Sequence, residues 1–103
     1  MGKLKNRVEA QKLYHVPGCT KLTRCPVNLV RFNTNNSKEH EMAKASVCYD
    51  LQKSGCEFIT EACRNDSGDI CDVICLDDFE EIEIVKTHGL EKAVSNGRTV
   101  VRV

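Results

Sequence analysis

The chain has 103 residues, of which 41% are apolar and 29% are charged. This composition is ordinary for a globular protein, and the length is enough for one small domain but not for a large enclosed substrate pocket. No apolar run could cross a bilayer, and the amino-terminal stretch MGKLKNRVEAQ lacks the apolar core of a signal peptide. We therefore expect a cytoplasmic protein without a membrane partner.

The formal net charge is zero, but the charges are unevenly divided along the chain. Residues 1–37 carry seven basic side chains against Glu9 alone, a balance of +6, and residues 38–103 carry the compensating −6. A basic arm beside an acidic core suits a protein that holds a polyanion while presenting carboxylates to a metal. A solvated tail over an acidic surface explains the charges equally well. We divide the chain into a basic extension (1–37) and a core domain (38–103).

The extension contains two candidate elements in chain order. The stretch VEAQKLYHV (8–16) favours a short helix, and the Pro-Gly pair after it indicates a turn. The stretch PVNLVRF (26–32) favours a strand that would add to the sheet of the core domain.

A helix is predicted over residues 38–53. Ser37 is a suitable N-cap, and the Ser-Gly-Cys stretch after residue 53 would end the helix. The apolar stripe of this helix consists of Ala43, Val47, Cys48 and Leu51. His40, Glu41 and Lys44 extend the stripe toward the amino end, so we expect them at the edge of the core.

Three short runs follow, and each predicts a strand: EFITEAC (57–63), ICDVICL (70–76) and EIEIVKT (81–87). The stretch HGLEKAVS (88–95) then favours a short helix, and RTVVRV (98–103) a final strand. From residue 38 the order is αβββαβ. It predicts an α/β fold with a mixed four-stranded sheet and the first helix against one face.

Acids interrupt the apolar strands of the predicted hairpin. Side chains alternate along a strand, so Asp72 shares a face with Ile74 and Leu76, and pairing can bring Glu83 onto the same face. Glu41 could approach from the helix that packs against this sheet. Mg²⁺ or Mn²⁺ would relieve the repulsion among three converging carboxylates. A solvated acidic face is the alternative explanation of the same pattern.

This order of elements and acids resembles the PD-(D/E)xK nuclease superfamily, in which restriction endonucleases and archaeal Holliday-junction resolvases share an αβββαβ core. The stretch NSKEHEMAKASVCYDLQKSGCEFITEACRNDSGDICDVICLDDFEEIEIVKT is especially similar to small nuclease-like proteins of archaea and their viruses. The resemblance covers residues 36–103. It implies a restriction-endonuclease-like fold and a Mg²⁺-dependent DNA endonuclease.

The resemblance also implies roles for individual residues. Glu41 corresponds to the helix acid, Asp72 to the strand aspartate, and Glu83 to the first acid of the (D/E)xK element. In that family these acids hold one or two Mg²⁺ ions, which activate a water molecule and stabilise charge on the phosphate. Glu61 could add a further ligand.

The chain departs from the family where the lysine should follow, because Val85 stands there. Lys44, one turn after Glu41, could supply the missing charge, or Lys86 could do so if a β-bulge re-aims it. The third alternative is a protein that kept the fold, lost catalysis and binds or regulates nucleic acid. His40 could support Glu41 as a partner or be only a helix-start residue, and the helix-start explanation is preferred. His88 would lie near the opening of the site, but a helix-end position accounts for it without a role.

The expected partners are DNA and a second copy of the chain. A nuclease of this size usually cuts both strands as a symmetric dimer, so we expect a homodimer. The predicted phosphate contacts lie in the basic extension and are Lys3, Lys5, Arg7, Lys12, Arg24 and Arg31.

Cysteine is unusually frequent, with seven residues. The odd count leaves at least one thiol unpaired, and without a signal peptide we interpret most of them as small buried hydrophobic residues. Disulfides are an alternative if the source is a hyperthermophilic archaeon, in which cytosolic disulfides occur. His15, Cys19 and Cys25 could instead bind zinc and make the chain a small zinc-stabilised interaction module, although the spacing lacks the usual CxxC pair. Mg²⁺ or Mn²⁺ is the expected cofactor rather than zinc.

Overall fold

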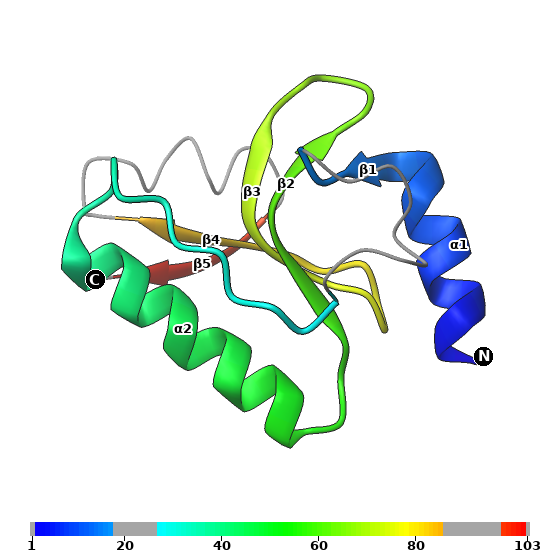
Figure 1. The fold of residues 1–103 in the computed structure, drawn as a ribbon, viewed down its shortest axis with the longest axis horizontal. Coiled ribbons are helices and arrows are strands. Elements are labelled where there is room, and N and C mark those ends of the chain that lie inside the picture. Colours follow the sequence, from blue (N-terminus) through cyan, green and yellow to red (C-terminus); the bar gives the residue numbers. More distant parts are fainter. Residues whose placement is uncertain (1, 18–26, 86–97, 103) are drawn as a thin grey trace.

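Five strands form one mixed sheet in the computed structural model, which describes residues 2–17, 27–85 and 98–102 (Figure 1). The strands are β1 (Tyr14–His15), β2 (Phe58–Arg64), β3 (Ile70–Cys75), β4 (Glu81–Val85) and β5 (Thr99–Arg102). They are hydrogen-bonded in sequence order. Neighbours from β1 to β4 are antiparallel, whereas β5 is parallel to β4.

The two faces of the sheet are buried against different parts of the chain. Because side chains alternate along β2, Phe58 points to one face and Ile59 to the other. The cluster on the side of helix α2 (Lys38–Lys53) contains Cys48, Phe58, Val73, Ile82 and Ile84. The cluster on the side of helix α1 (Lys3–Leu13) contains Ala10, Tyr14, Val16, Ile59, Ala62, Cys71, Ile74 and Leu76. Figure 1 shows α2 running along the sheet and α1 beside β1.

The prediction for α2 is confirmed at both ends. Ser37 is its N-cap, and the Ser37 hydroxyl accepts a hydrogen bond from the His40 backbone N–H at 3.1 Å. The helix ends before Gly55, whose φ of 84° lies in the left-handed region that glycine adopts without strain. The same capping signals that indicated the helix in the sequence therefore set its bounds.

The strands of the core domain are confirmed with small shifts at their ends. The predicted run 57–63 becomes β2, the run 70–76 becomes β3, and the run 98–103 becomes β5. The run 81–87 is confirmed as a strand, β4, up to Val85, and its last two residues lie outside the described residues. The helix predicted over 88–95 lies outside the described residues.

The amino-terminal extension differs more from its prediction. Its helix, α1, begins at Lys3 rather than at residue 8 and ends at Leu13, because the chain turns into the extended β1 at Tyr14. An extra strand does join the sheet, as expected, but it is β1 and not the run 26–32.

The strand predicted over 26–32 is wrong, since the part of it that the structure describes forms no strand. Asn28 has a φ of 63°, and its Oδ1 accepts a hydrogen bond from the Phe58 N–H at 3.0 Å. The Thr60 hydroxyl oxygen similarly accepts one from the Arg31 N–H at 3.0 Å. One backbone hydrogen bond joins the segment to β2, from the Asn28 N–H to the Phe58 carbonyl at 2.9 Å. The bonds to Asn28 Oδ1 and to the Thr60 hydroxyl use side-chain acceptors, so no regular strand ladder forms.

The described residues thus give a mixed α/β fold with a five-stranded sheet and two helices. Among them no helix is long and apolar enough to span a bilayer. The amino end of α2 meets the junction of β3 and β4, and this meeting point brings the predicted site residues together.

Candidate carboxylate site

Asp72 lies between β4 and the amino end of α2. Its Oδ2 accepts a hydrogen bond from the Ile84 N–H at 2.8 Å and lies 3.4 Å from His40 Nε2. The last backbone pair between β3 and β4 on this side is Val73 with Ile82, so the Asp72 carboxylate takes the place of the next carbonyl acceptor. The prediction that Asp72 and Ile74 share a face of the sheet is wrong. Ile74 belongs to the cluster on the α1 side, whereas Asp72 contacts His40 of α2.

Asp72 and Glu83 are close enough to affect each other's charge. Continuing the β3–β4 register by one residue sets them opposite each other on neighbouring strands. Burial and the neighbouring Asp72 carboxylate raise the pKa of Glu83 to about 7, although Arg98 and His40 oppose this shift. Burial also raises the pKa of Asp72, against the Ile84 N–H that favours its charged form. Near neutral pH the state in which both Asp72 and Glu83 are negatively charged is therefore energetically unfavourable.

Glu41 is held quite differently, although it is also buried. Its Oε1 accepts from Lys44 Nζ and from the Asn33 N–H, each at 2.6 Å, and its Oε2 accepts from Asn36 Nδ2 at 3.2 Å. His40 Nδ1 lies 2.6 Å from the same Oε2. Burial by itself would raise the pKa of Glu41, but these four groups outweigh it and lower that pKa to about 2. Glu41 is a carboxylate with its hydrogen-bonding capacity filled.

Lys44 is the cation of the site and is completely shielded from solvent. Besides its contact with Glu41, its Nζ donates to the Arg31 carbonyl at 2.6 Å and lies 3.6 Å from Glu61 Oε2. The lysine on α2 is therefore among the predicted acids. Val85, at the position where the resemblance led us to expect a lysine, is buried. Lys86, the other candidate, lies outside the described residues.

Glu61 combines two unusual features in the middle of β2. Its φ of 52° is in the left-handed region, which costs a residue with a side chain roughly 1–3 kcal/mol. Its Oε2 is buried and has no hydrogen-bond partner. Glu61 also lies opposite Asp72, because the neighbouring pairs of β2 and β3 are Thr60 with Val73 and Ala62 with Cys71. Acids of three adjacent strands thus form one row.

Arg98 belongs to the same region, and sequence reasoning missed it. Its Nε lies 3.1 Å from Glu81 Oε1, and its Nη1 lies 3.1 Å from Glu83 Oε2. The side chain is only 6% exposed, and its Nη2 has no partner. An arginine at the start of the strand predicted over 98–103 was the available signal, but only the parallel pairing of β5 with β4 places it beside these acids.

The row of acids presents hard oxygen donors of the kind that bind small divalent cations. Within residues 2–17, 27–85 and 98–102, no three His, Cys, Asp or Glu side chains are already arranged around a single ion position. Mg²⁺ commonly binds through only one or two carboxylates together with water and substrate phosphates. Asp72 and Glu83 offer such a pair, and Glu61 Oε2, which has no hydrogen-bond partner and lies 3.6 Å from Lys44 Nζ, offers a third hard donor. These oxygen donors suit Mg²⁺ or Mn²⁺ better than zinc.

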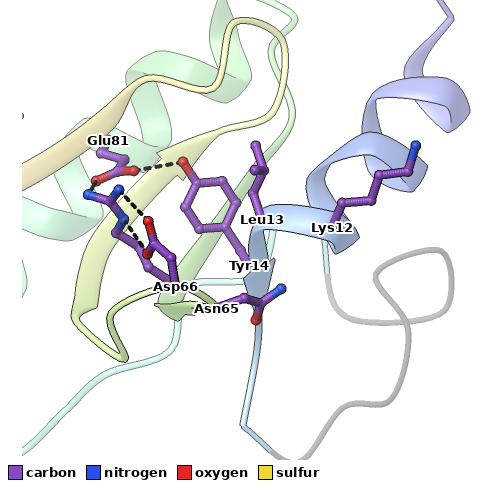
Figure 2. A pocket seen from close by; sticks show the side chains of 7 residues that line it. Lys12, Leu13, Tyr14, Asn65, Asp66 and Glu81 are labelled. Atoms are coloured by element: carbon purple, nitrogen blue, oxygen red, sulfur yellow. Dashed lines mark hydrogen bonds and ion pairs between the residues drawn. The ribbon is translucent and has the colours of Figure 1, made fainter.

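A pocket of about 210 Å³ lies next to this region, beside β1 (Figure 2). Tyr14 points across it, and its hydroxyl donates a hydrogen bond to Glu81 Oε2 at 2.7 Å. Arg64 contacts both Asp66 and Glu81 from the wall of the pocket. Since these polar groups satisfy one another, the pocket supports the position of Glu81 rather than offering free groups to a ligand.

Several of the predicted phosphate contacts are engaged within the fold. Lys3 pairs with Asp77, Arg7 with Glu57, and Lys12 with Glu9. Arg31 donates to the Pro17 carbonyl at 3.4 Å, Lys5 is exposed, and Arg24 lies outside the described residues. Of the five described residues in this set, Lys3, Arg7 and Lys12 are therefore paired with acids of the chain itself.

The zinc prediction can be followed only at His15, since Cys19 and Cys25 lie outside the described residues, as does His88. His15 is exposed on β1, and its Nδ1 lies 2.7 Å from Asn65 Oδ1. The described cysteines are free thiols, namely Cys48, Cys56, Cys63, Cys71 and Cys75. Burial raises the pKa of Cys48 to about 12, as expected of a small hydrophobic residue in a core.

Comparison with known proteins identifies no relative. Neither family models, nor curated proteins, nor solved structures give a match to the chain. The likeness to the nuclease superfamily therefore stays a prediction from the order of elements and acids, to be judged by the chemistry of the site.

Proposed function

We propose that the chain is a Mg²⁺-dependent nuclease that hydrolyses phosphodiester bonds in DNA. The observation that carries the proposal is the closeness of two acids on neighbouring strands, the buried Asp72 and the partly buried Glu83. Acids placed in this way disfavour a second negative charge, and a divalent cation removes that cost. A restriction-endonuclease-like core goes with this proposal.

Asp72 and Glu83 would hold the ion, with Glu61 as the third oxygen donor. When bound, Mg²⁺ supplies an activated water molecule and stabilises the charge that develops on the scissile phosphate. Asp72 is kept in place by the Ile84 N–H, and Glu83 by Arg98. Both acids are therefore oriented by the strands before any ligand arrives, as a preorganised site requires.

Glu41 would form a fixed ion pair with Lys44 and would not bind the metal directly. Glu41 could bind an ion directly only by losing hydrogen bonds from its present donors. In its present position it anchors Lys44 and His40, whose nearest ring nitrogen faces Asp72. Lys44 then provides, from the helix, the positive charge that Val85 cannot provide from β4.

The DNA and the dimer are the less defined parts of the proposal. Exposed lysines such as Lys5, and ion pairs at the surface such as Lys12 with Glu9, can contact phosphates at little cost, because exposed pairs contribute about 0–1 kcal/mol. A homodimer would let two sites reach both strands. A cytoplasmic location would supply Mg²⁺ and keep the described thiols reduced.

A nuclease-like protein without catalysis is the second candidate, and one observation favours it. Four groups of the protein already interact with the Glu41 carboxylate. This is expected if Glu41 now stabilises the fold and no longer binds a metal. Such a protein would bind or regulate nucleic acid without cutting it, and its binding would weaken as salt rises.

Cleavage assays with matched variants test the proposal. Purified protein is mixed with plasmid, branched and single-stranded DNA in Mg²⁺, Mn²⁺ or EDTA. Cutting should require the metal, and Asp72→Asn should reduce it by at least about 100-fold. Asparagine retains an acceptor for the Ile84 N–H, so the fold is expected to survive. Glu80→Gln, at an exposed acid of the same hairpin, is the control and should cut normally.

The outcomes separate the two candidates. If the protein binds DNA in a salt-sensitive way but cuts it in none of the metals, the nuclease proposal is rejected in favour of the non-catalytic protein. Cutting by Asp72→Asn at the unaltered rate would place the chemistry elsewhere and remove the carboxylate site from consideration.

A further inference from the structure

His15 and Cys63 face each other at the β1–β2 edge, away from the carboxylate row. They are direct partners in the antiparallel ladder, so their side chains leave the same face with Cβ atoms roughly 4.5–5.5 Å apart. His15 is exposed, and Cys63 is half-buried with a free thiol. An imidazole and a thiolate at this separation can share one ion, because Zn–N and Zn–S bonds are about 2.0 and 2.3 Å long.

Asn65 fixes the orientation of the His15 ring. Its Nδ2 donates to the Gln11 carbonyl at 3.3 Å, and its N–H donates to the Leu13 carbonyl at 2.8 Å. With the amide nitrogen occupied in this way, Oδ1 is the atom that faces His15 Nδ1 at 2.7 Å. Nδ1 must then carry the ring proton, which leaves the Nε2 lone pair for a ligand. Metal-binding histidines are generally oriented by such an acceptor.

We propose that His15 and Cys63 bind a soft divalent cation, zinc, through Nε2 and the Cys63 thiolate. Binding displaces the thiol proton to solvent and changes no oxidation state. Tetrahedral zinc has two further positions, which water molecules or thiolates can fill. Cys19 and Cys25 lie outside the described residues, and variants of both test whether the ion is held by other thiolates.

Such an ion would stabilise the weakest part of the sheet. β1 has only two residues and is an edge strand, yet it links α1 to the rest of the fold. Small domains often need a metal or a disulfide to hold such segments, since their core alone is small. The zinc pair is independent of the carboxylate row, because soft sulfur and nitrogen donors select a different ion from the hard oxygens of Asp72 and Glu83.

Cobalt is a suitable probe, because a thiolate bound to Co²⁺ gives a charge-transfer absorption that oxygen ligands do not. The full chain, freed of metal, is titrated with Co²⁺ and then with Zn²⁺. We expect the thiolate band to appear with Co²⁺ and to disappear when Zn²⁺ displaces it. Cys63→Ser and His15→Ala should each weaken cobalt binding at least tenfold, and Asn65→Ala should weaken it roughly 10–100-fold.

Two control variants make the result specific. Cys56→Ser changes another half-buried thiol, and Asp72→Asn changes the carboxylate site, so both should keep the band unaltered. A band that persists in Cys63→Ser but is lost in the double variant Cys19→Ser/Cys25→Ser would place the ion on other cysteines and overturn the proposal. The complete lack of a thiolate band in the unaltered protein would overturn it as well.

Discussion

Lys44 and Glu41 lie one turn apart on α2, and Lys44 Nζ meets Glu41 Oε1 at 2.6 Å while the lysine side chain is fully shielded from solvent. A buried ammonium group is tolerated only with such partners, here Glu41, Glu61 and the Arg31 carbonyl. The pair therefore contributes to both the stability and the electrostatics of the carboxylate site.

Replacing this lysine should destabilise the fold strongly. Lys44→Met leaves Glu41 and Glu61 buried without their cation, and we expect the free energy of unfolding to fall by about 3–5 kcal/mol. Urea denaturation measures this change. Adding Glu41→Gln should recover part of the loss, because the second change removes one of the uncompensated charges.

Lys53→Met at the exposed end of α2 is the matched control and should change stability by no more than about 0.5 kcal/mol. A cost below about 1 kcal/mol for Lys44→Met would show that the buried lysine is not held by these acids.

Stability without metal should decrease as the pH rises toward neutrality. The pKa of Glu83 is raised to about 7 in the folded chain, so the folded state binds this proton more tightly than the unfolded state. The resulting stabilisation is fully present below the ordinary glutamate pKa and is lost as the pH rises through about 7. The raised pKa of Asp72 acts in the same direction.

Urea unfolding in EDTA at several pH values, compared between the unaltered protein and Glu83→Gln, isolates this effect. The advantage of the unaltered protein should shrink with rising pH, and added Mg²⁺ should restore part of it. An advantage that grew with pH instead would show that Glu83 is charged and well paired in the fold.

An ion pair between α1 and the core should produce the opposite pH dependence. Arg7 hydrogen-bonds Glu57 through Nε at 2.9 Å and lowers the pKa of that carboxyl, against a smaller effect of burial. Its stabilisation is present above the ordinary glutamate pKa and is lost as the pH falls through the lower folded pKa. Glu57→Gln should cost about 1 kcal/mol at neutral pH and almost nothing in acid.

Thermal unfolding between acidic and neutral pH measures the loss, with Lys12→Met as control. The pair of Lys12 with Glu9 is largely exposed, so this control should leave stability unchanged. If Glu57→Gln cost the same at every pH, packing rather than charge would explain the contact.

The backbone at Glu61 gives a prediction that is independent of its charge. Because its φ of 52° is strained for any residue with a Cβ, Glu61→Gly should be more stable than Glu61→Ala by about 1 kcal/mol. Both variants remove the carboxylate, so their difference reports the backbone alone. Urea denaturation compares them, and a more stable alanine variant would mean that β2 has an ordinary conformation at this position.

The sequence was sufficient to predict the helix and strands whose signals come from residues a few positions apart. Ser37 and Gly55 bound α2, and runs of β-branched residues mark β2, β3 and β4, because capping and alternation depend on residues a few positions apart. The acids Glu41, Asp72 and Glu83 could be singled out for the same reason, since polar residues interrupt otherwise apolar faces.

Only the tertiary structure decided how these residues are partnered. The stretch 26–32 has strand-forming side chains, but Asn28 and Thr60 bond it to β2 through side chains, which no local pattern reveals. Likewise, the sequence treats Glu41 and Glu83 as equivalent acids. In the fold, Lys44 and three other donors fill the hydrogen-bonding capacity of Glu41, whereas Asp72 opposes the charge of Glu83. Contacts between distant segments set these environments, and the environment decides whether a carboxylate supports the fold or awaits a cation.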